Sequence, residues 1–166
     1  MTLRCILVAV VCCLACPGAA LAAAGDPAID NEERAFCKQI NTYRAQNRLP
    51  ALRLSVALTK SSEWLSASMA RFDYFDHTDN LGRNFSRRIT ASGYGGATRG
   101  ENIAAGTDGS ASAMFNQWKN SAPHRKNMLS ASFKVLGVGR AYNAGSMFGW
   151  YWTTDFGGTL DRTMPC

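Results

Sequence analysis

Hydrophobic residues recur at helical spacing in two stretches of the first half of the chain. The apolar side chains lie 7, 4 and 3 positions apart within residues 26–49, and the same intervals return within residues 55–72. Such spacing is typical of one face of an amphipathic helix, so the pattern predicts two helices. The apolar positions are Ile29, Phe36, Ile40 and Tyr43 in the first stretch and Leu58, Leu65, Met69 and Phe72 in the second.

The predicted helices carry recognisable end signals. Asp30 or Asn31 can cap the first helix, and acidic residues follow in its first turn, where they suit the helix dipole. Pro50 ends that helix, and Ser55 is expected to cap the second.

The middle of the chain is rich in turn-forming residues. Positions 76–83 predict turns, and Asn84 is expected to cap a short helix that Gly93 ends. Five glycines between positions 93 and 106 predict a loop that passes close to other backbone.

The last third of the chain predicts helices followed by strands. A helix is expected over residues 110–120, and Ser121 is expected to cap a further short helix that has Pro123 in its first turn. Residues 133–142 and 147–156 are aromatic and β-branched and predict a hairpin. Because no βαβ units alternate along the chain, the expected class is α+β, with helices packed on an antiparallel sheet.

The first 22 residues predict a secretory signal peptide. Arg4 precedes an uncharged run, and a tail of small residues ends at Ala22, the expected cleavage site. Pro17 interrupts the apolar run short of the ~20 residues that a bilayer span needs. Residues 23–166 are then expected to form a single extracytoplasmic domain, secreted outside the cell or into the periplasm. Acylation of Cys16, which would tether the protein to a membrane, is the alternative.

Removal of the signal leaves two of the six cysteines, Cys37 and Cys166. An even number of cysteines outside the cytoplasm predicts a disulfide, which would hold the C-terminus against the first helix. Two separate buried thiols are the alternative.

The charge balance favours acidic partners. The chain has 18 basic and 12 acidic residues, and loss of Arg4 leaves 17 against 12, a charge of +5. An anionic lipid surface or wall polymer would suit this balance, whereas scattered basic residues without aromatic interleaving do not predict nucleic-acid binding. Five arginines fall in the segments that carry the candidate site, and we expect them to concentrate positive charge around it. The alternative is that they are solvated or pair with Asp73, Asp76 and Asp79. They are Arg83, Arg87, Arg88, Arg99 and Arg125.

Three residues are candidates for metal binding or acid–base catalysis. His77 and His124 are the two histidines of the chain, and Glu101 lies among glycines without a visible structural role. The remaining glutamates suit helices: Glu32 and Glu33 in a first turn, and Glu63 on an exposed face. Two imidazoles and a carboxylate can bind zinc, with water in the fourth position, or perform acid–base chemistry.

Nothing local fixes the geometry of these candidates. The gaps of 24 and 23 residues differ from the close spacing of a His-Glu-x-x-His helix, and each histidine alone suits a structural hydrogen bond. The sequence has no Gly-x-Ser-x-Gly motif, so covalent catalysis is not expected.

A series of short motifs follows in order along the chain. The motifs are Phe75-Asp76-His77, Gly82-Arg83, Arg88, Gly93-Tyr94, Gly100-Glu101-Asn102-Ile103-Ala104, Trp118-x-x-Ser121-x-x-His124-Arg125-x-Asn127-Met128-Leu129, Gly137-Val138-Gly139, and Tyr151-Trp152-Thr153-Thr154-Asp155-Phe156-Gly157. Together they resemble the CAP superfamily of cysteine-rich secretory proteins, antigen 5 and pathogenesis-related proteins, in its compact bacterial form. The resemblance covers about residues 32–157. It implies a three-layer α-β-α sandwich with a central antiparallel sheet and a cleft floor bearing two histidines and two acids.

His77, Glu101 and His124 fall on three of the four cleft positions that the resemblance implies, and Ser121 replaces the second acid. The long aromatic loop associated with sterol binding in eukaryotic members is not evident.

We therefore expect a non-catalytic binder that needs no cofactor and holds a lipid or cell-wall ligand in this cleft. A metal-assisted, protease-like hydrolase, with zinc on His77 and His124 and Glu101 as base, is the alternative. An extracellular interaction module with a vestigial site is a third reading. The pattern predicts no oligomeric state.

Overall fold

The computed structural model describes residues 25–166. The predicted signal peptide, its cleavage site after Ala22 and Cys16 lie outside the described residues.

A five-stranded sheet forms the middle of the molecule, in the order β2-β4-β3-β1-β5. Its neighbouring strands are antiparallel except for β1 and β3, which run parallel. The strands are β1 (Arg53–Ser55), β2 (Arg99–Gly106), β3 (Val135–Tyr142), β4 (Trp150–Gly157) and β5 (Thr163–Met164).

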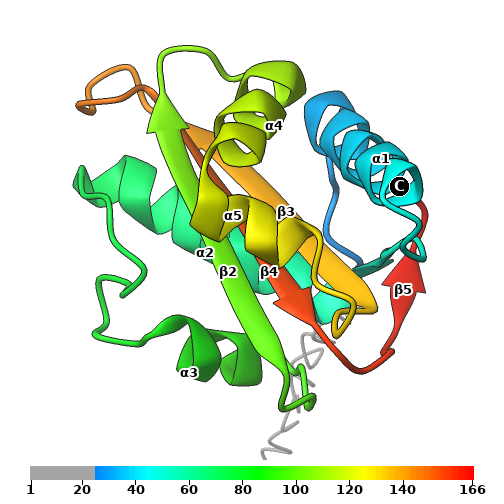
Figure 1. Cartoon of the computed structure of the whole chain (residues 1–166). Coiled ribbons are helices and arrows are strands. Elements are labelled where there is room, and N and C mark those ends of the chain that lie inside the picture. Colours follow the sequence, from blue (N-terminus) through cyan, green and yellow to red (C-terminus); the bar gives the residue numbers. More distant parts are fainter. Residues whose placement is uncertain (1–24) are drawn as a thin grey trace, which may run out of the picture.

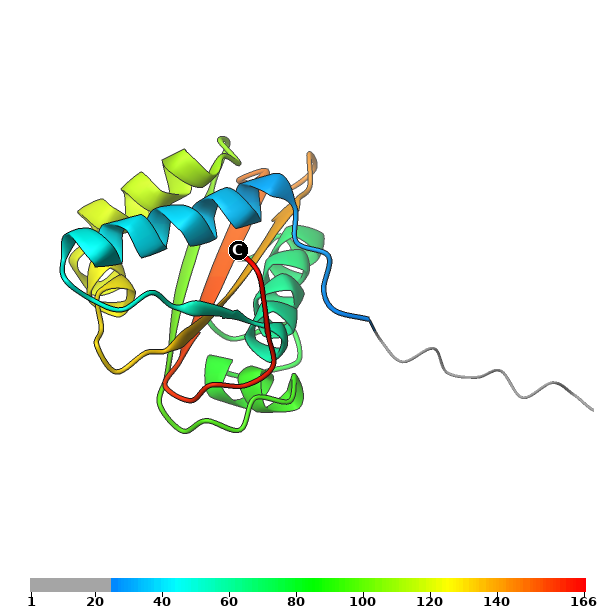
Figure 2. The same ribbon diagram turned by 90° about the vertical axis from the view of Figure 1, so that its right-hand side faces the viewer.

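Helices cover both faces of this sheet, as Figure 2 shows most clearly. One face carries α1, α4 and α5, and the opposite face carries α2 and α3 (Figure 1). The helices are α1 (Asn31–Gln46), α2 (Val56–Phe72), α3 (Phe85–Ala91), α4 (Ala111–Asn120) and α5 (Ala122–Met128). The predicted α+β class and three-layer α-β-α sandwich are confirmed. Within residues 25–166, every helix falls short of the length and apolarity that crossing a bilayer requires.

The predicted caps position three of the helices. Asp30 accepts hydrogen bonds from the backbone of Glu32 and Glu33, and the Glu33 carboxylate accepts one from the Asp30 backbone at 2.7 Å. This reciprocal arrangement is a capping box. Ser55 and Asn84 cap α2 and α3 through their side chains.

Two glycines let α2 lie directly on the sheet. A Cβ at Gly137 would lie 2.1 Å from the backbone of Leu58, and one at Gly139 would lie 2.3 Å from the backbone nitrogen of Glu63. This close approach brings the serines of α2 within hydrogen-bond distance of β4, and Ser66 donates to the Thr153 hydroxyl at 2.9 Å.

Aromatic side chains fill the other side of the sheet. Phe36, Trp118 and Trp152 are fully buried, and the Phe36 ring lies 5.1 Å and 5.8 Å from the two indoles. The indole N–H of Trp118 donates to the Ile103 carbonyl at 3.1 Å, which ties α4 to β2.

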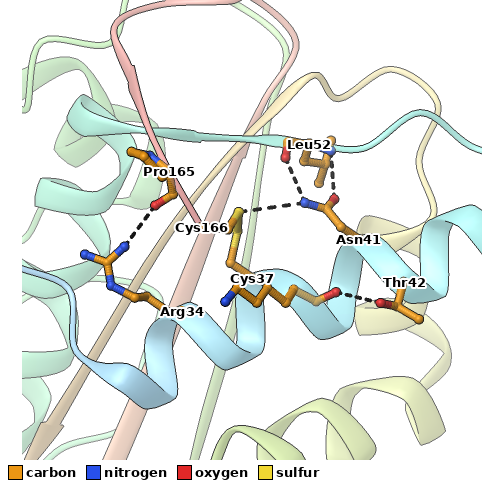
Figure 3. Close-up of a disulfide and its surroundings, with 8 residues drawn as sticks. Arg34, Cys37, Asn41, Thr42, Leu52, Pro165 and Cys166 are labelled. Carbon is orange, nitrogen blue, oxygen red and sulfur yellow. Dashed lines mark hydrogen bonds between the residues drawn. A yellow bond between two sulfur atoms is a disulfide. The ribbon is translucent and has the colours of Figure 1, made fainter.

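The C-terminus is held against α1 by a Cys37–Cys166 disulfide (Figure 3). The two Cα atoms lie 5.6 Å apart, and Cys37 is fully buried. Arg34, one turn before Cys37, donates to the Pro165 carbonyl at 3.2 Å. The predicted disulfide is confirmed, and the alternative of two separate thiols is wrong.

The glycine-rich segment differs from the prediction. Residues 99–106 form the edge strand β2 rather than a loop, and β2 pairs with β4 so that Glu101 faces Asp155 across the ladder. The glycines concealed this strand because they lower its apparent β propensity. The prediction of an exposed Glu63 is also wrong: this residue is half-buried, and burial raises its pKa to about 7.

Candidate functional site

Glu101 is the centre of the candidate site. Its side chain is 1% exposed, and both carboxylate oxygens are engaged. Oε1 lies 2.7 Å from Nδ1 of His77, and Oε2 accepts from a guanidinium N–H of Arg88. Arg88 comes from α3 and also donates to the His77 carbonyl at 3.2 Å. A single buried guanidinium therefore positions both Glu101 and the backbone of His77.

His77 presents a half-exposed imidazole above this ion pair, with 53% of its side chain accessible. The hydrogen bond to Glu101 raises the pKa of His77, and the negative charge of Glu101 adds to this effect, although burial opposes it. The site consequently favours a cationic ring at its mouth.

A second acid lies behind Glu101. Asp155 faces Glu101 in the β2–β4 register and is fully buried. Burial, followed by the charge of Glu101, raises the pKa of Asp155 well above its ordinary range and so favours its neutral form. Ser62 of α2 donates to Asp155 Oδ2 at 3.1 Å.

Arg88 and Asp155 belonged to the motifs that carry the family resemblance, and Arg88 was expected to add positive charge near the site. The contact of neither residue with Glu101 was predicted. Each had a local signal. Arg88 lies in a short predicted helix, and Asp155 interrupts an aromatic, β-branched strand. Neither signal names the partner, because Arg88, Glu101 and Asp155 come from three separate elements.

Ser121 and His124 form a pair at the start of α5. The Ser121 hydroxyl lies 2.8 Å from His124 Nδ1, and its side chain makes no capping hydrogen bond. Ser121 occupies the predicted N-cap position, but its hydroxyl does not cap the helix because the imidazole one turn further on takes it. Burial, and to a lesser extent the charge of His77, lowers the pKa of His124.

Two asparagines connect the two histidine regions across the edge strand. The Asn127 amide donates to the Glu101 carbonyl at 3.2 Å and to Asn102 Oδ1 at 2.8 Å. Asn102 in turn donates to the His124 carbonyl at 3.1 Å. The sequence analysis predicted no such bridge, although Asn102 and Asn127 both belong to the motifs of the resemblance.

An open depression of about 560 Å³ adjoins Glu101. Of the four predicted cleft residues, His77 and Glu101 line it, whereas Ser121, the N-cap of α5, and His124 in its first turn lie outside the lining. The lining residues are His77, Asn84, Phe85, Arg99, Gly100, Glu101 and Asn127.

The two imidazoles suit a metal ion better than the acids do. The Nδ1 atoms of His77 and His124 each have a hydrogen-bond partner, which leaves Nε2 as the coordinating atom in the way typical of metal-bound histidines. Both oxygens of Glu101 are occupied. Over the described span 25–166, no three His, Cys, Asp or Glu side chains gather as a ligand set. The residues thus fit at most two protein ligands, with water or a bound ligand completing the coordination.

Several of the five arginines near the candidate site are bound to other protein groups and so cannot bind a ligand. Arg88 forms an ion pair with Glu101. Arg83 pairs with Asp79 at 2.8 Å, as expected if these arginines bind the acids of the loop. Arg99 donates to backbone carbonyls, including that of Tyr94 at 3.1 Å. Arg87 remains exposed.

Comparisons with known proteins place this geometry in a family. The model of the cysteine-rich secretory protein family, CAP, matches residues 38–156. YkwD, an uncharacterized protein of Bacillus subtilis, is 33% identical over 125 residues, which are 75% of this chain and 46% of YkwD.

Solved structures share the fold. An extracellular protein from Bacillus anthracis that contains an SCP domain superimposes with a TM-score of 0.68 at 26% identity, covering 77% of this chain and 40% of that one. An outer surface protein of Borrelia burgdorferi gives a TM-score of 0.69 at 19% identity, covering 80% of this chain and 97% of that one. The chain thus spans less than half of YkwD and of the Bacillus anthracis protein. Because the family model matches well over half of its residues, this chain belongs to the CAP family of cysteine-rich secretory proteins.

Proposed function

We propose that this protein is an extracytoplasmic binding protein that holds a lipid or cell-wall-derived ligand in the depression beside His77 and Glu101, without turning it over. The observation that carries the proposal is the state of Glu101. A general base must reach the proton that it removes. The Glu101 carboxylate is buried, and its two oxygens are taken by His77 and Arg88.

The lining of the depression indicates the ligand chemistry. Its lining includes the His77 imidazole, whose cationic form is favoured, the Asn84 side-chain amide and the apolar ring of Phe85. A ligand with a carboxylate or phosphate next to a ring or an alkyl segment suits this set. Both an anionic wall fragment and a lipid headgroup have this chemistry.

Three observations support an extracytoplasmic location. The Cys37–Cys166 disulfide is a bond that persists in oxidising compartments. The similar proteins from Bacillus anthracis and Borrelia burgdorferi are described as extracellular and as an outer surface protein. The first 22 residues have the pattern of a secretory signal peptide.

The free Nε2 atoms of His77 and His124 favour a second candidate, a zinc-dependent hydrolase. Zinc would act as a Lewis acid or activate water when bound. Titration calorimetry with zinc alone tests this candidate, with His77→Ala and His124→Ala as variants. Loss of zinc binding in both variants would support it. If wild type and a variant that carries both His77→Ala and His124→Ala bind zinc equally, these imidazoles are not the ligands.

Untargeted mass spectrometry of material that copurifies with the protein tests the binding proposal. We expect an anionic lipid or wall fragment on wild type and its loss from His77→Ala, because that variant removes the imidazole at the mouth of the depression. Lys126→Ala, an exposed change on α5, is the matched control and should retain the ligand. Equal ligand on all three proteins would contradict the proposed site.

A further inference from the structure

A groove runs between α1 and α4, which lie side by side on one face of the sheet, as Figure 1 and Figure 2 show. Its volume is about 350 Å³, within the range of small-ligand sites. The lining residues fall within positions 38–46 of α1 and 112–119 of α4, and we call this hollow the α1–α4 groove. None of them lines the depression beside His77, so the groove is a separate candidate site.

Both charged side chains of the α1–α4 groove are cations. Lys38 and Lys119 line it and are exposed, and neither takes part in the ion pairs found within residues 25–166. The Lys119 ammonium lies 5.3 Å from the ring centroid of Tyr43 and 6.0 Å from that of Phe115. These are cation–π distances, so aromatic rings rather than a carboxylate hold this charge at the groove.

The helices that form the groove contain few acids. The sequence has no aspartate or glutamate at positions 34–62 or 109–154, which include most of α1 and the whole of α4 and α5. Beyond the end of α1, Arg48 adds a further exposed cation. The charge along the groove is therefore positive.

The acids at the other end of the groove, where α1 and α4 begin, lie outside its lining. Asp30 pairs with Arg140 at 2.6 Å, and Glu33 is buried. Glu32 accepts the backbone N–H of Ala111 at 2.7 Å.

The exposed Asp108 precedes α4 and accepts a backbone N–H at 2.8 Å. It is a single carboxylate at one end, so it leaves both lysines of the groove without an acidic partner.

The uncharged lining suits hydroxyl groups. It contains the hydroxyls of Thr42 and Ser112 and the amides of three residues, Gln39, Gln46 and Asn116. Hydroxyls and amides each donate and accept hydrogen bonds, as the hydroxyls of a sugar do.

Two aromatic rings add an apolar surface to the groove. The rings of Tyr43 and Phe115 meet edge to face at 5.6 Å and give the sugar C–H groups a surface to pack on.

A bilayer is a poorer fit for this face. Residues 25–166 expose seven large hydrophobic side chains, and none of these belongs to α1, α4 or α5. A surface that lies in a membrane interface needs such side chains. The groove therefore favours a polar anion in solution or in a hydrated polymer.

We propose that the α1–α4 groove binds a segment of a linear acidic polysaccharide. Eight residue steps of α1 separate the ends of the lining, which is about 12 Å at 1.5 Å per residue, and this length suits a stretch of chain better than a small free anion. Carboxylate or phosphate groups of the chain pair with Lys38 and Lys119. Its hydroxyls bind the amides and hydroxyls between them.

Fluorescence anisotropy with labelled oligogalacturonate tests the proposal. We expect wild type to bind this probe, and binding to weaken as salt screens the lysines. Lys38→Gln with Lys119→Gln should weaken binding about tenfold, because each exposed ion pair contributes up to about fivefold in affinity. Arg71→Gln, which removes an exposed cation of α2 on the opposite face of the sheet, should bind like wild type. Equal binding by wild type and the double lysine variant would overturn the proposed site.

Polyglutamate of equal charge separates sugar recognition from charge alone. We expect wild type to bind it more weakly than oligogalacturonate. Gln46→Ala with Asn116→Ala, two exposed positions, should weaken binding of oligogalacturonate and leave that of polyglutamate unchanged. Equal affinity of wild type for the two probes would overturn the assignment to a polysaccharide.

Two further measurements separate this groove from other sites and ligands. His77→Ala should bind oligogalacturonate like wild type, because His77 lies outside the groove, so this result stands even if the proposed function fails. Loss of the probe from His77→Ala would place it in the depression and overturn the groove. Binding of phosphatidylglycerol vesicles that the double lysine variant loses, without binding of oligogalacturonate, would assign the lysines to a membrane instead.

Discussion

Arg88 and Glu101 face each other as an ion pair in which each side chain is 1% exposed. Removing two charges from water is costly, and their mutual attraction compensates only while both are present. This pair also supports His77, because Glu101 binds its ring and Arg88 binds its carbonyl. The mouth of the depression therefore depends on a buried pair beneath it.

Removal of Arg88 should strongly destabilise the fold. Arg88→Met leaves Glu101 as a buried, uncompensated carboxylate, and we expect a loss of about 3–5 kcal/mol in the free energy of unfolding. Urea denaturation measures this loss. The double variant Arg88→Met with Glu101→Gln should recover part of the stability, since no charge is left unpaired. A loss below about 1 kcal/mol in the single variant would contradict the buried pair.

The two histidines should titrate on opposite sides of the ordinary value. Glu101 raises the pKa of His77, whereas burial lowers that of His124. With two histidines in the chain, the ring proton signals in an NMR titration are readily separated, and His77→Gln assigns them. We expect one midpoint above about 6.5 and one below it. In Glu101→Gln, the higher midpoint should move down; an unmoved midpoint would contradict the His77–Glu101 contact.

The shifted pKa values of the two histidines also make the free energy of unfolding depend on pH. A raised pKa of His77 in the folded state contributes stability below pH ~6.5 that is lost as the pH rises through the folded-state pKa. The contribution is small because the ring is half-exposed. His124 acts oppositely: its contribution is present above pH ~6.5 and is lost as the pH falls toward its lower folded-state pKa.

Glu63→Gln should stabilise the protein in alkaline solution. Burial and the nearby Glu33 raise the pKa of Glu63 to about 7, so the folded state disfavours its charged form. The stability associated with the neutral carboxyl is present below pH ~4.5 and is lost as the pH rises through 7. At pH 8 we expect a gain of about 1–2 kcal/mol, discounted for the water that reaches this half-buried group. Thermal unfolding at pH 8 and pH 4.5 checks this, and an equal effect at both values would refute it.

Reduction of the disulfide should destabilise the protein considerably. Cys37 and Cys166 are 129 positions apart, and closing so long a loop in the unfolded chain corresponds to roughly 4–5 kcal/mol. We expect a lower urea midpoint for Cys37→Ser with Cys166→Ser than for the oxidised protein. Intact mass without reductant tests both the bond and the predicted N-terminus near Ala23. Two thiols that react with alkylating agents in the folded protein would exclude the bond.

Local patterns predicted the features that local physics determines. The apolar period around Phe36 and Ile40 and the Asp30 cap indicated α1, and cysteine parity indicated the disulfide. The edge strand around Glu101 escaped prediction because its glycines resemble those of a loop, and its pairing with β4 is visible only in three dimensions.

Only part of the site was predicted, because some of its residues meet only in the folded chain. His77 and Glu101 were singled out as unexplained polar residues, and the structure joins them at 2.7 Å. The buried partners Arg88 and Asp155 lie on α3 and β4, and only the assembled fold brings them to Glu101. Ser121 was correctly placed at the N-cap of α5, but its position in the sequence does not reveal that His124 binds its hydroxyl.

The most direct test of the central claim is prolonged incubation of the protein with solubilised wall fragments and anionic lipid, followed by mass spectrometry of the bound and free fractions. We predict that the ligand is recovered intact from the bound fraction and that Glu101→Gln, which disturbs the support of His77, reduces the bound amount without changing the ligand. Continued release of cleaved product by wild type, abolished in Glu101→Gln, would contradict the binding account and identify a hydrolase.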